Sequence, residues 1–213
     1  MSHRPFLTVQ SGPLRHAAAP TTLGTFTVVG DDLAVTAIHY PGATDPGDGT
    51  WGEPVPLDEH PVLREATSQL AEFLDGERTD FDLPLRPRGT EFQLAAWAAL
   101  LEIPYGRTTS YREQAVRLGR PTAVRAVGSA NGRNPIPVVI PCHRVIGAGG
   151  SLTGYAGGVG LKAALLDLES GQARLEPSVG APPAEDGAAT KGAIKEGAVE
   201  GEPTMDGGDA APR

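Results

Sequence analysis

One short segment, residues 134–147, combines the residue types best suited to covalent chemistry. It contains the single cysteine of the chain, Cys142, followed directly by His143 and Arg144. A thiol becomes a strong nucleophile once it loses its proton. The imidazole could accept that proton as a base, and the guanidinium could favour the thiolate by its charge. One interpretation of this segment is therefore a nucleophilic cysteine.

Proline stiffens the approach to this cysteine. Three prolines, at positions 135, 137 and 141, fix φ just before Cys142. Adjacent side chains of an extended segment point apart, so contact between Cys142 and His143 requires a turn, a helix or a bridging water. The alternative interpretation is a buried cysteine that packs as a small apolar residue. A single cysteine cannot form an internal disulfide or a cysteine-based zinc cluster.

Charge is divided unevenly along the chain. The net charge of −8 argues against a polyanionic partner, yet residues 85–172 carry ten Lys and Arg against five Asp and Glu, whereas residues 1–84 carry four against thirteen. Nine of those ten basic residues are Arg, which makes forked contacts with phosphates and bases. Because a polyanion meets the local field, the middle segment could bind nucleic acid. A codon usage rich in Arg explains the same composition equally well.

The first part of the chain predicts a β-hairpin. Runs rich in β-branched and apolar residues at 25–29 and 33–38 are separated by Gly-Asp-Asp at 30–32, a turn signal. Gly, Pro and Asp are frequent in residues 41–56, so we expect a loop there.

A helix is expected next, from His60 to Asp75, because apolar residues recur there at helical spacing and Gly76 follows. Residues 81–85 are predicted to be a short extended piece, and residues 86–89 a linker. Together these elements predict a small α+β unit over residues 1–84.

The following residues are mostly helical by pattern. Thr90 and Ser110 are typical N-cap residues, each preceding a predicted helix. A third helix is expected at 122–130 and a last one at 161–169. The short turn between the second and third helices, which contains Gly119, suggests a helix-turn-helix. Any helical hairpin in a small bundle would give the same pattern.

The ends of the chain carry different signals. Residues 173–213 are mostly Gly, Ala, Pro and charged residues without periodicity, so we expect a disordered tail. There is no apolar run of about 18 residues that could span a membrane, and the first ten residues do not resemble a secretory signal. We therefore expect a cytoplasmic protein with three parts: residues 1–84, 85–172 and 173–213.

The motif Pro-Cys-His-Arg-Val at 141–145 closely resembles the signature of the O6-alkylguanine-DNA alkyltransferases, also called methylated-DNA–protein-cysteine methyltransferases. The resemblance covers roughly residues 20–170. Within the family, the chain is most similar to the bacterial stand-alone form. Further matching motifs are Gly89-Thr-Glu-Phe-Gln93, Ile103-Pro-Tyr-Gly-Arg-Thr-Thr-Ser-Tyr111, Arg125-Ala-Val-Gly-Ser-Ala-Asn131 and Leu152-Thr-Gly-Tyr-Ala-Gly-Gly158. The resemblance implies a small ribonuclease H-like α+β domain followed by a mostly helical domain with a helix-turn-helix.

The same resemblance implies a DNA-repair reaction that occurs once per chain. Cys142 would attack the alkyl carbon of O6-alkylguanine in DNA, with O4-alkylthymine as an open second substrate. His143 would act as base through a bridging water, and Glu169 would orient His143. Tyr111 would protonate or hydrogen-bond guanine N3 as the base leaves.

The resemblance further implies how DNA is held. Arg125 would replace the flipped nucleotide in the stack, and its helix would lie in the minor groove of double-stranded DNA. Small residues on that helix permit close approach to DNA, although ordinary helix packing explains them equally well. The implied DNA-binding residues are Thr122, Ala123, Arg125, Ala126 and Asn131. The implied substrate pocket comprises Asn134, Pro137, Arg144, Val145, Tyr155 and Ala156, with Asn134 bracing the turn and backbone groups reading the guanine edge.

Two departures and two alternatives bear on this interpretation. Some family members have Ser where this chain has Ala156, and the lost hydroxyl predicts a shifted substrate preference. Some members carry a structural zinc in the N-terminal domain; because the one cysteine here is assigned to the reaction, we expect none in this chain. We also expect no cofactor and a monomeric protein. One alternative function is a thiol hydrolase that uses Cys142 and His143 and turns over. The other is a helix-turn-helix protein that binds alkylated DNA without repairing it, as relatives without the reactive cysteine do.

Overall fold

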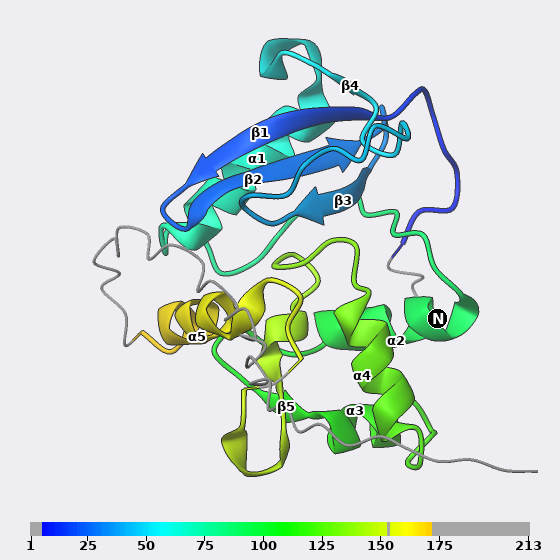
Figure 1. Ribbon diagram of the computed structural model, residues 1–213, viewed down its shortest axis with the longest axis vertical. Helices are drawn as coiled ribbons and strands as arrows, with labels where there is room; N and C mark the ends of the chain where they lie inside the picture. Colours follow the sequence, from blue (N-terminus) through cyan, green and yellow to red (C-terminus); the bar gives the residue numbers. More distant parts are fainter. Residues whose placement is uncertain (1–5, 153, 172–213) are drawn as a thin grey trace, which may run out of the picture. The chain divides into compact units, whose positions relative to one another are not determined.

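This computed structural model describes residues 6–152 and 154–171, whose main elements are a four-stranded sheet and five α-helices (Figure 1). This combination of a small sheet with helices confirms the α+β class. The expected tail at 173–213 lies outside the described residues. No described helix is long and apolar enough to cross a membrane, and the cytoplasmic location stays a prediction.

The sheet has the strand order β3-β2-β1-β4. The predicted hairpin is confirmed as β2 (Gly24–Gly30) and β3 (Val35–His39), which pair antiparallel. β1 (Arg15–Thr21) pairs antiparallel with β2, and the short β4 (Glu53–Pro54) pairs parallel with β1 within the expected loop. The sequence did not predict β1, because its Ala-rich stretch lacks the β-branched residues that favour strands.

Helix α1 (Pro61–Leu74) covers one face of this sheet and confirms the predicted helix (Figure 1). The His60 ring caps its start, because Nδ1 accepts a hydrogen bond from the backbone N–H of Leu63 at 3.3 Å. Gly76 follows its end with a φ of +79°, the left-handed conformation that glycine adopts without strain. The apolar side chains of α1 are buried against the sheet: Leu63, Ala66, Leu70, Phe73 and Leu74.

Helices α2 (Glu91–Leu101), α3 (Tyr111–Arg117) and α4 (Val124–Gly132) pack together. The two predicted N-caps are confirmed, and each forms a capping box with the third residue of its helix. Such a cap stabilises a helix by about 1 kcal/mol. α4 is shifted two residues toward the C-terminus from its predicted range. α5 (Gly158–Glu169) begins three residues earlier than predicted.

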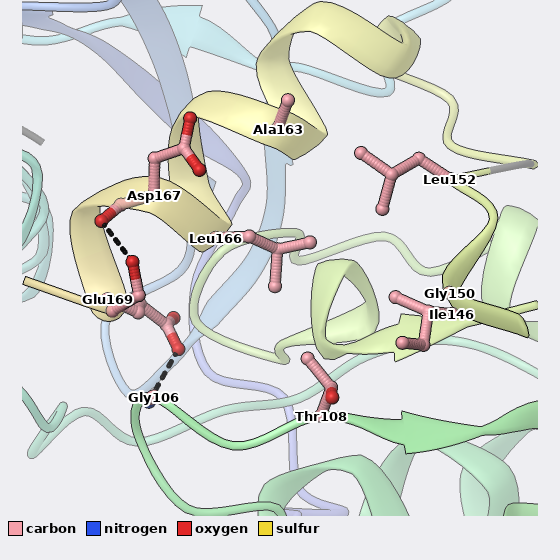
Figure 2. A pocket seen from close by; sticks show the side chains of 10 residues that line it. Gly106, Thr108, Ile146, Gly150, Leu152, Ala163, Leu166, Asp167 and Glu169 are labelled. Atoms are coloured by element: carbon pink, nitrogen blue, oxygen red, sulfur yellow. Dashed lines mark hydrogen bonds between the residues drawn. The ribbon is translucent and has the colours of Figure 1, made fainter. Parts of the chain in front are cut away.

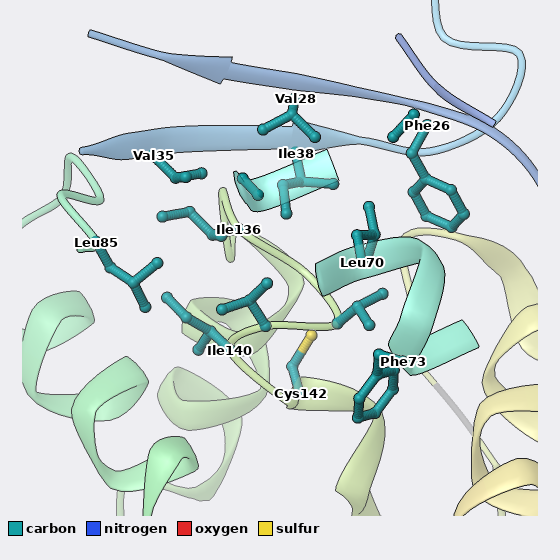
Figure 3. Packing of buried hydrophobic residues seen from close by; sticks show 14 of the residues in the cluster. Phe26, Val28, Val35, Ile38, Leu70, Phe73, Leu85, Ile136, Ile140 and Cys142 are labelled. Carbon is teal, nitrogen blue, oxygen red and sulfur yellow. The ribbon is translucent and has the colours of Figure 1, made fainter. Parts of the chain in front are cut away.

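The hydrophobic core is continuous across the expected boundary at residues 84 and 85. Phe26 and Val28 of the sheet belong to the same buried cluster as Ile136 and Ile140, which precede Cys142 in the chain (Figure 3). The N–H of Ile38 in β3 also donates to the carbonyl of Pro135 at 2.8 Å. The sheet therefore supports the approach to the cysteine directly, and the division into residues 1–84 and 85–172 stays a prediction.

The expected linker at 86–89 begins with a buried ion pair. The guanidinium of Arg86 pairs with the carboxylate of Asp31, which is fully buried and also accepts the N–H groups of Leu33 and Ala34. The preceding segment, 81–85, joins the sheet through an isolated bridge between Leu85 and Val35 rather than as a strand of its own. The start of the linker is thus fixed to the turn between β2 and β3.

Candidate active site

Cys142 is the first residue of a single 3-10 turn, η2 (Cys142–Arg144), and only 6% of its surface is exposed. Consecutive side chains of a 3-10 helix are rotated by about 120° and do not point in opposite directions as in a strand. Contact between the adjacent Cys142 and His143 was expected to require a turn, a helix or a bridging water, and this 3-10 turn supplies the first of these. His143 and Arg144 are buried as well.

Asn134 braces the loop that leads to the cysteine. Its side-chain amide donates to the carbonyl of Ile140 at 2.7 Å and to Sγ of Cys142 at 3.2 Å. Its Oδ1 accepts the N–H of Ile136 at 3.0 Å. One side chain therefore ties both ends of the loop to the sulfur.

The same loop contains an unusual backbone conformation. Val138 has a φ of +72°, and it is the only non-glycine residue in the described ranges with a positive φ. A β-branched residue in this region costs about 1–3 kcal/mol. Val138 is buried, and the N–H of Ile140 donates to the carbonyl of Ile136 at 2.9 Å across it. Packing and the Asn134 brace hold the loop in this strained shape.

The carboxylate of Glu169, at the end of α5, gathers the polar groups beside the cysteine. Nε2 of His143 lies 2.7 Å from Oε1, and Nε of Arg144 donates to both oxygens at 2.9 and 3.1 Å. The N–H of Gly106 donates to Oε2 at 3.0 Å. Arg144 also donates to the carbonyl of Ile103 at 2.6 Å, so its guanidinium is committed to this cluster.

These contacts set the protonation states of the pair. Burial alone would raise the pKa of Glu169, but hydrogen bonds from His143 and Arg144 lower it below its usual value. Burial lowers the pKa of His143 despite the opposing effect of Glu169. Near pH 7 the carboxylate is therefore ionised and the imidazole neutral. With Nε2 assigned as the donor to Glu169, Nδ1 is a buried acceptor without a partner among the described residues.

The thiol itself is not activated by its resting environment. Burial raises the pKa of Cys142 to about 11, against the opposing effects of the Asn134 hydrogen bond and the positive charge of Lys162. A thiol with this pKa is almost entirely protonated at neutral pH. Transfer of its proton to a base is therefore needed before it can act as a nucleophile.

Lys162 was not singled out in the sequence. It is fully buried in α5, and its Nζ donates to the carbonyl of Val145 at 2.6 Å. The sequence contained a signal, since a single lysine stands among apolar residues at helical spacing from Leu165 and Glu169, which are also buried. The cation that lowers the thiol pKa is thus Lys162, while Arg144 is bound to Glu169.

Three tyrosines surround this cluster. Tyr111 opens α3 directly after β5 (Thr109–Ser110), which pairs with β6 (Val145–Ile146) just beyond the cysteine. Nζ of Lys162 lies 5.9 Å from the centroid of the Tyr111 ring. Burial, followed by the charge of Cys142, raises the pKa of Tyr111 and Tyr155. Tyr40, which the sequence did not indicate, packs edge-on against Tyr155 with ring centroids 5.6 Å apart.

The residues expected to contact DNA differ in how exposed they are. Thr122, Arg125 and Ala126 are exposed at the start of α4, and Ala123 is half-buried. Asn131 is buried, and its side chain exchanges hydrogen bonds with Gln114 of α3 at 2.7 and 3.2 Å. Asn131 therefore links α3 and α4. Because its side chain is buried and already hydrogen-bonded, this position does not favour the predicted DNA contact.

The small residues of α4 were explained either by close approach to DNA or by helix packing, and the structure supports a different explanation for each of two alanines. Ala130 is buried, and its carbonyl accepts the indole N–H of Trp97 at 2.9 Å, which is helix packing. Ala126 remains exposed beside Arg125. Most arginines of residues 85–172 are exposed as well: Arg88, Arg107, Arg112, Arg117, Arg120, Arg125 and Arg133.

A cavity of about 370 Å³ lies beside α5 (Figure 2). Its lining is mostly apolar, from residues such as Ile146, Leu152 and Leu166, and it includes Glu169 but neither Cys142 nor any of the three tyrosines. The cavity therefore borders the polar cluster at Glu169, but Cys142 does not line it. No three His, Cys, Asp or Glu side chains within residues 6–152 and 154–171 are grouped so that they could hold a metal ion.

Comparison with known proteins shows the family of this chain. The family profile for the DNA-binding domain of 6-O-methylguanine DNA methyltransferase matches residues 91–171. The methylated-DNA–protein-cysteine methyltransferase of Mycobacterium tuberculosis H37Rv is 44% identical over 160 residues, which cover 75% of this chain and 94% of the relative. The chain belongs to the methylated-DNA–protein-cysteine methyltransferase family.

Other family members extend the comparison. The methylated-DNA–protein-cysteine methyltransferase of Methanosarcina barkeri is 52% identical over 118 residues, covering 55% of this chain and 75% of the relative. The crystal structure of the M. tuberculosis O6-methylguanine methyltransferase superimposes with a TM-score of 0.67 at 43% identity, over 75% of this chain and 94% of that one. A structure of the M. tuberculosis protein in complex with DNA gives a TM-score of 0.66 at 44% identity, with the same coverage.

Proposed function

We propose that this protein repairs DNA by transferring an alkyl group from O6 of guanine to Sγ of Cys142. The observation that carries the proposal is a buried cysteine beside a histidine whose Nε2 is held by Glu169 at 2.7 Å. This arrangement supplies a nucleophile, a neutral base and a carboxylate that orients the base. Its family relatives are named for the transfer of methyl groups from DNA to a protein cysteine.

The reaction is a direct displacement. The thiol proton passes to Nδ1 of His143 through a bridging water, and Glu169 stabilises the imidazolium that results. Sγ of Cys142 then forms a bond to the alkyl carbon while the bond from that carbon to O6 breaks. The electron pair remains on the guanine, which Tyr111 assists by donating a proton or a hydrogen bond to N3. The raised pKa of Tyr111 keeps its phenol protonated for this purpose.

The product explains why transfer occurs once per chain. A thioether at Cys142 is not readily hydrolysed, and no second nucleophile is needed to complete the displacement. The protein is therefore consumed as a reagent, in contrast to a thiol hydrolase, which regenerates its cysteine. No cofactor takes part in this scheme.

The guanine pocket is assigned to the groups around the thiol. The carbonyl of Val145, held by Lys162, and the backbone at 155–156 read the edge of the base, with the ring of Tyr155 beside them. Asn134 and Pro137 shape the loop below Cys142. We assign Arg144 to the positioning of Glu169, because its guanidinium already binds that carboxylate.

DNA binding is assigned to α3 and α4 as a helix-turn-helix that enters the minor groove of double-stranded DNA. Arg125 is exposed near the start of α4, where it can occupy the space of a flipped nucleotide. Exposed Thr122 and Ala126 flank it, and Ala123 is partly accessible. The neighbouring arginines would contact phosphates. A ribonuclease H-like N-terminal domain and a monomeric state complete the proposal.

Intact-mass spectrometry tests this function. The protein is mixed with a duplex that contains one O6-methylguanine, and the expected result is one methyl group of added mass, located on Cys142. Repeated demethylation by each chain without added mass would instead favour a hydrolase. Binding of the duplex without any transfer would favour a protein that only recognises alkylated DNA.

A further inference from the structure

Tyr40 links the N-terminal sheet to the surroundings of the thiol. It follows β3 directly, and strand alternation places it on the same face as Ile38. Ile38 is fixed to the approach to Cys142 through its hydrogen bond to Pro135. The end of β3 is therefore anchored to the loop that carries the cysteine.

The ring of Tyr40 is wedged between the sheet and the segment that contains Tyr155. On one side its centroid lies 6.3 Å from that of Phe26, which is fully buried. On the other side it meets the Tyr155 ring at 5.6 Å and an interplanar angle of 66°. A Cβ placed on Gly157 would lie 2.7 Å from Cε1 of Tyr40, so glycine is needed there for this close approach.

Both tyrosine rings also pack against the buried hydrophobic cluster that contains Cys142. Burial is the main cause that raises the pKa of Tyr40 above its ordinary value, followed by the charge that Cys142 carries once ionised. The same two causes raise the pKa of Tyr155. Tyr40 and Tyr155 thus form an edge-to-face pair, with Phe26 on the other side of the Tyr40 ring.

We propose that Tyr40 is a specificity-determining residue, whose ring backs Tyr155 and Gly157 and so sets the size of the alkyl group that can reach Cys142. This inference rests on the proposed alkyl transfer. An edge-to-face aromatic pair is more favourable than its buried area alone would make it, and this attraction holds the Tyr155 ring in place. Without the Tyr40 ring, Tyr155 can move into the space that it leaves, and the wall beside the thiol recedes.

The test compares two substrates on the full-length protein. Second-order rate constants are measured by intact mass for duplexes that differ only in carrying O6-methylguanine or O6-benzylguanine. Tyr40→Leu is expected to raise the benzyl-to-methyl ratio by about fivefold or more, within the range that pocket size controls. Tyr40→Phe keeps the ring and should leave the ratio within about twofold of the parent value.

A second variant and a control separate the effect of ring size at Tyr40 from a general loss of folding. Tyr40→Trp enlarges the ring and should lower the benzyl-to-methyl ratio, so it decides the question if Tyr40→Leu does not fold. Val29→Ala removes a buried side chain from the opposite face of the same sheet and should leave the ratio unchanged. Equal changes in both rates for Tyr40→Leu and Tyr40→Trp would overturn the inference. If the parent protein acquires no alkyl group at all, the proposed function itself is wrong.

Discussion

The surroundings of Cys142 differ from the exposed side of α3 and α4 in how their charged side chains are held. Around the thiol, His143, Arg144 and Glu169 are buried and bonded to one another at short range. On α3 and α4 the arginines are mostly exposed to solvent. Burial sets pKa values and fixes geometry, which chemistry requires, whereas exposed charges are screened and adaptable, which suits contact with phosphates.

This contrast separates the expected effects of substitution. Changes in the buried cluster should alter the rate of transfer and the stability of the fold while leaving DNA affinity close to the parent value. Changes on the exposed helices should alter DNA affinity and the handling of duplex substrates while leaving the chemistry of the thiol intact.

The largest effect is expected for Cys142→Ser, because a hydroxyl in place of the thiol is a far weaker nucleophile. Methyl transfer from a duplex containing O6-methylguanine should be lost, as measured by intact mass. Binding of the same duplex, measured by fluorescence anisotropy, should persist. A methylated Cys142→Ser protein would show that another residue accepts the group.

Replacing the base or its orienting carboxylate should slow transfer by about 10²–10⁴-fold. The variants are His143→Ala and Glu169→Gln, and the measurement is the second-order rate constant by intact mass. Glu169→Gln also leaves the buried Arg144 without its carboxylate, so it should lower the melting temperature.

Asp167→Asn is the matched control, since it neutralises an exposed carboxylate on the same helix. It should react at the parent rate. Parent rates for both His143→Ala and Glu169→Gln would mean that the thiol loses its proton by another route.

Arg125→Ala should separate base flipping from chemistry. Unstacking a base costs a few kcal/mol in a duplex and nothing for free O6-benzylguanine, so the duplex reaction should slow by about 10–100-fold more than the free-base reaction. Arg133→Ala, also exposed but just beyond α4, should affect both substrates little. Equal losses on both substrates for Arg125→Ala would assign Arg125 to the pocket or the fold.

The rate of transfer should depend on pH through His143. Burial lowers the pKa of this imidazole below 6.5, and only its neutral form can accept the thiol proton. The rate should therefore be level around pH 7–8 and fall, approaching tenfold per unit, once the pH drops below the lowered pKa. A rate that instead rises tenfold per unit from pH 7 toward 10 would indicate that the thiol, with its pKa of about 11, ionises without the histidine.

The smallest effect is expected for a single phosphate-binding arginine. DNA affinity should fall as salt rises, and Arg117→Ala should reduce the slope of log affinity against log salt by about one. Arg78→Ala, in the acidic part of the chain at residues 1–84, should leave the slope unchanged. An unchanged slope for Arg117→Ala as well would place the DNA-binding surface away from the end of α3.

Local structure was predictable wherever neighbouring residues decide it. The β2–β3 hairpin follows from its Gly-Asp-Asp turn, and α2 and α3 begin at Thr90 and Ser110 because these side chains cap the helix that follows. β1 was missed because its strand is fixed by pairing along the full length of β2 and not by its own Ala-rich sequence. Short-range chemistry could not reveal that pairing.

The sequence by itself identified the family and Cys142 as the candidate nucleophile, because this cysteine and the motifs around it are contiguous in the chain. Only the tertiary structure decided that Lys162 and not Arg144 lowers the thiol pKa, that Asn131 joins two helices, and that Tyr40 reaches Tyr155. These outcomes depend on which distant segments are packed against one another in a continuous core. Burial and pKa are set by that packing, and a linear pattern of residue types does not contain it.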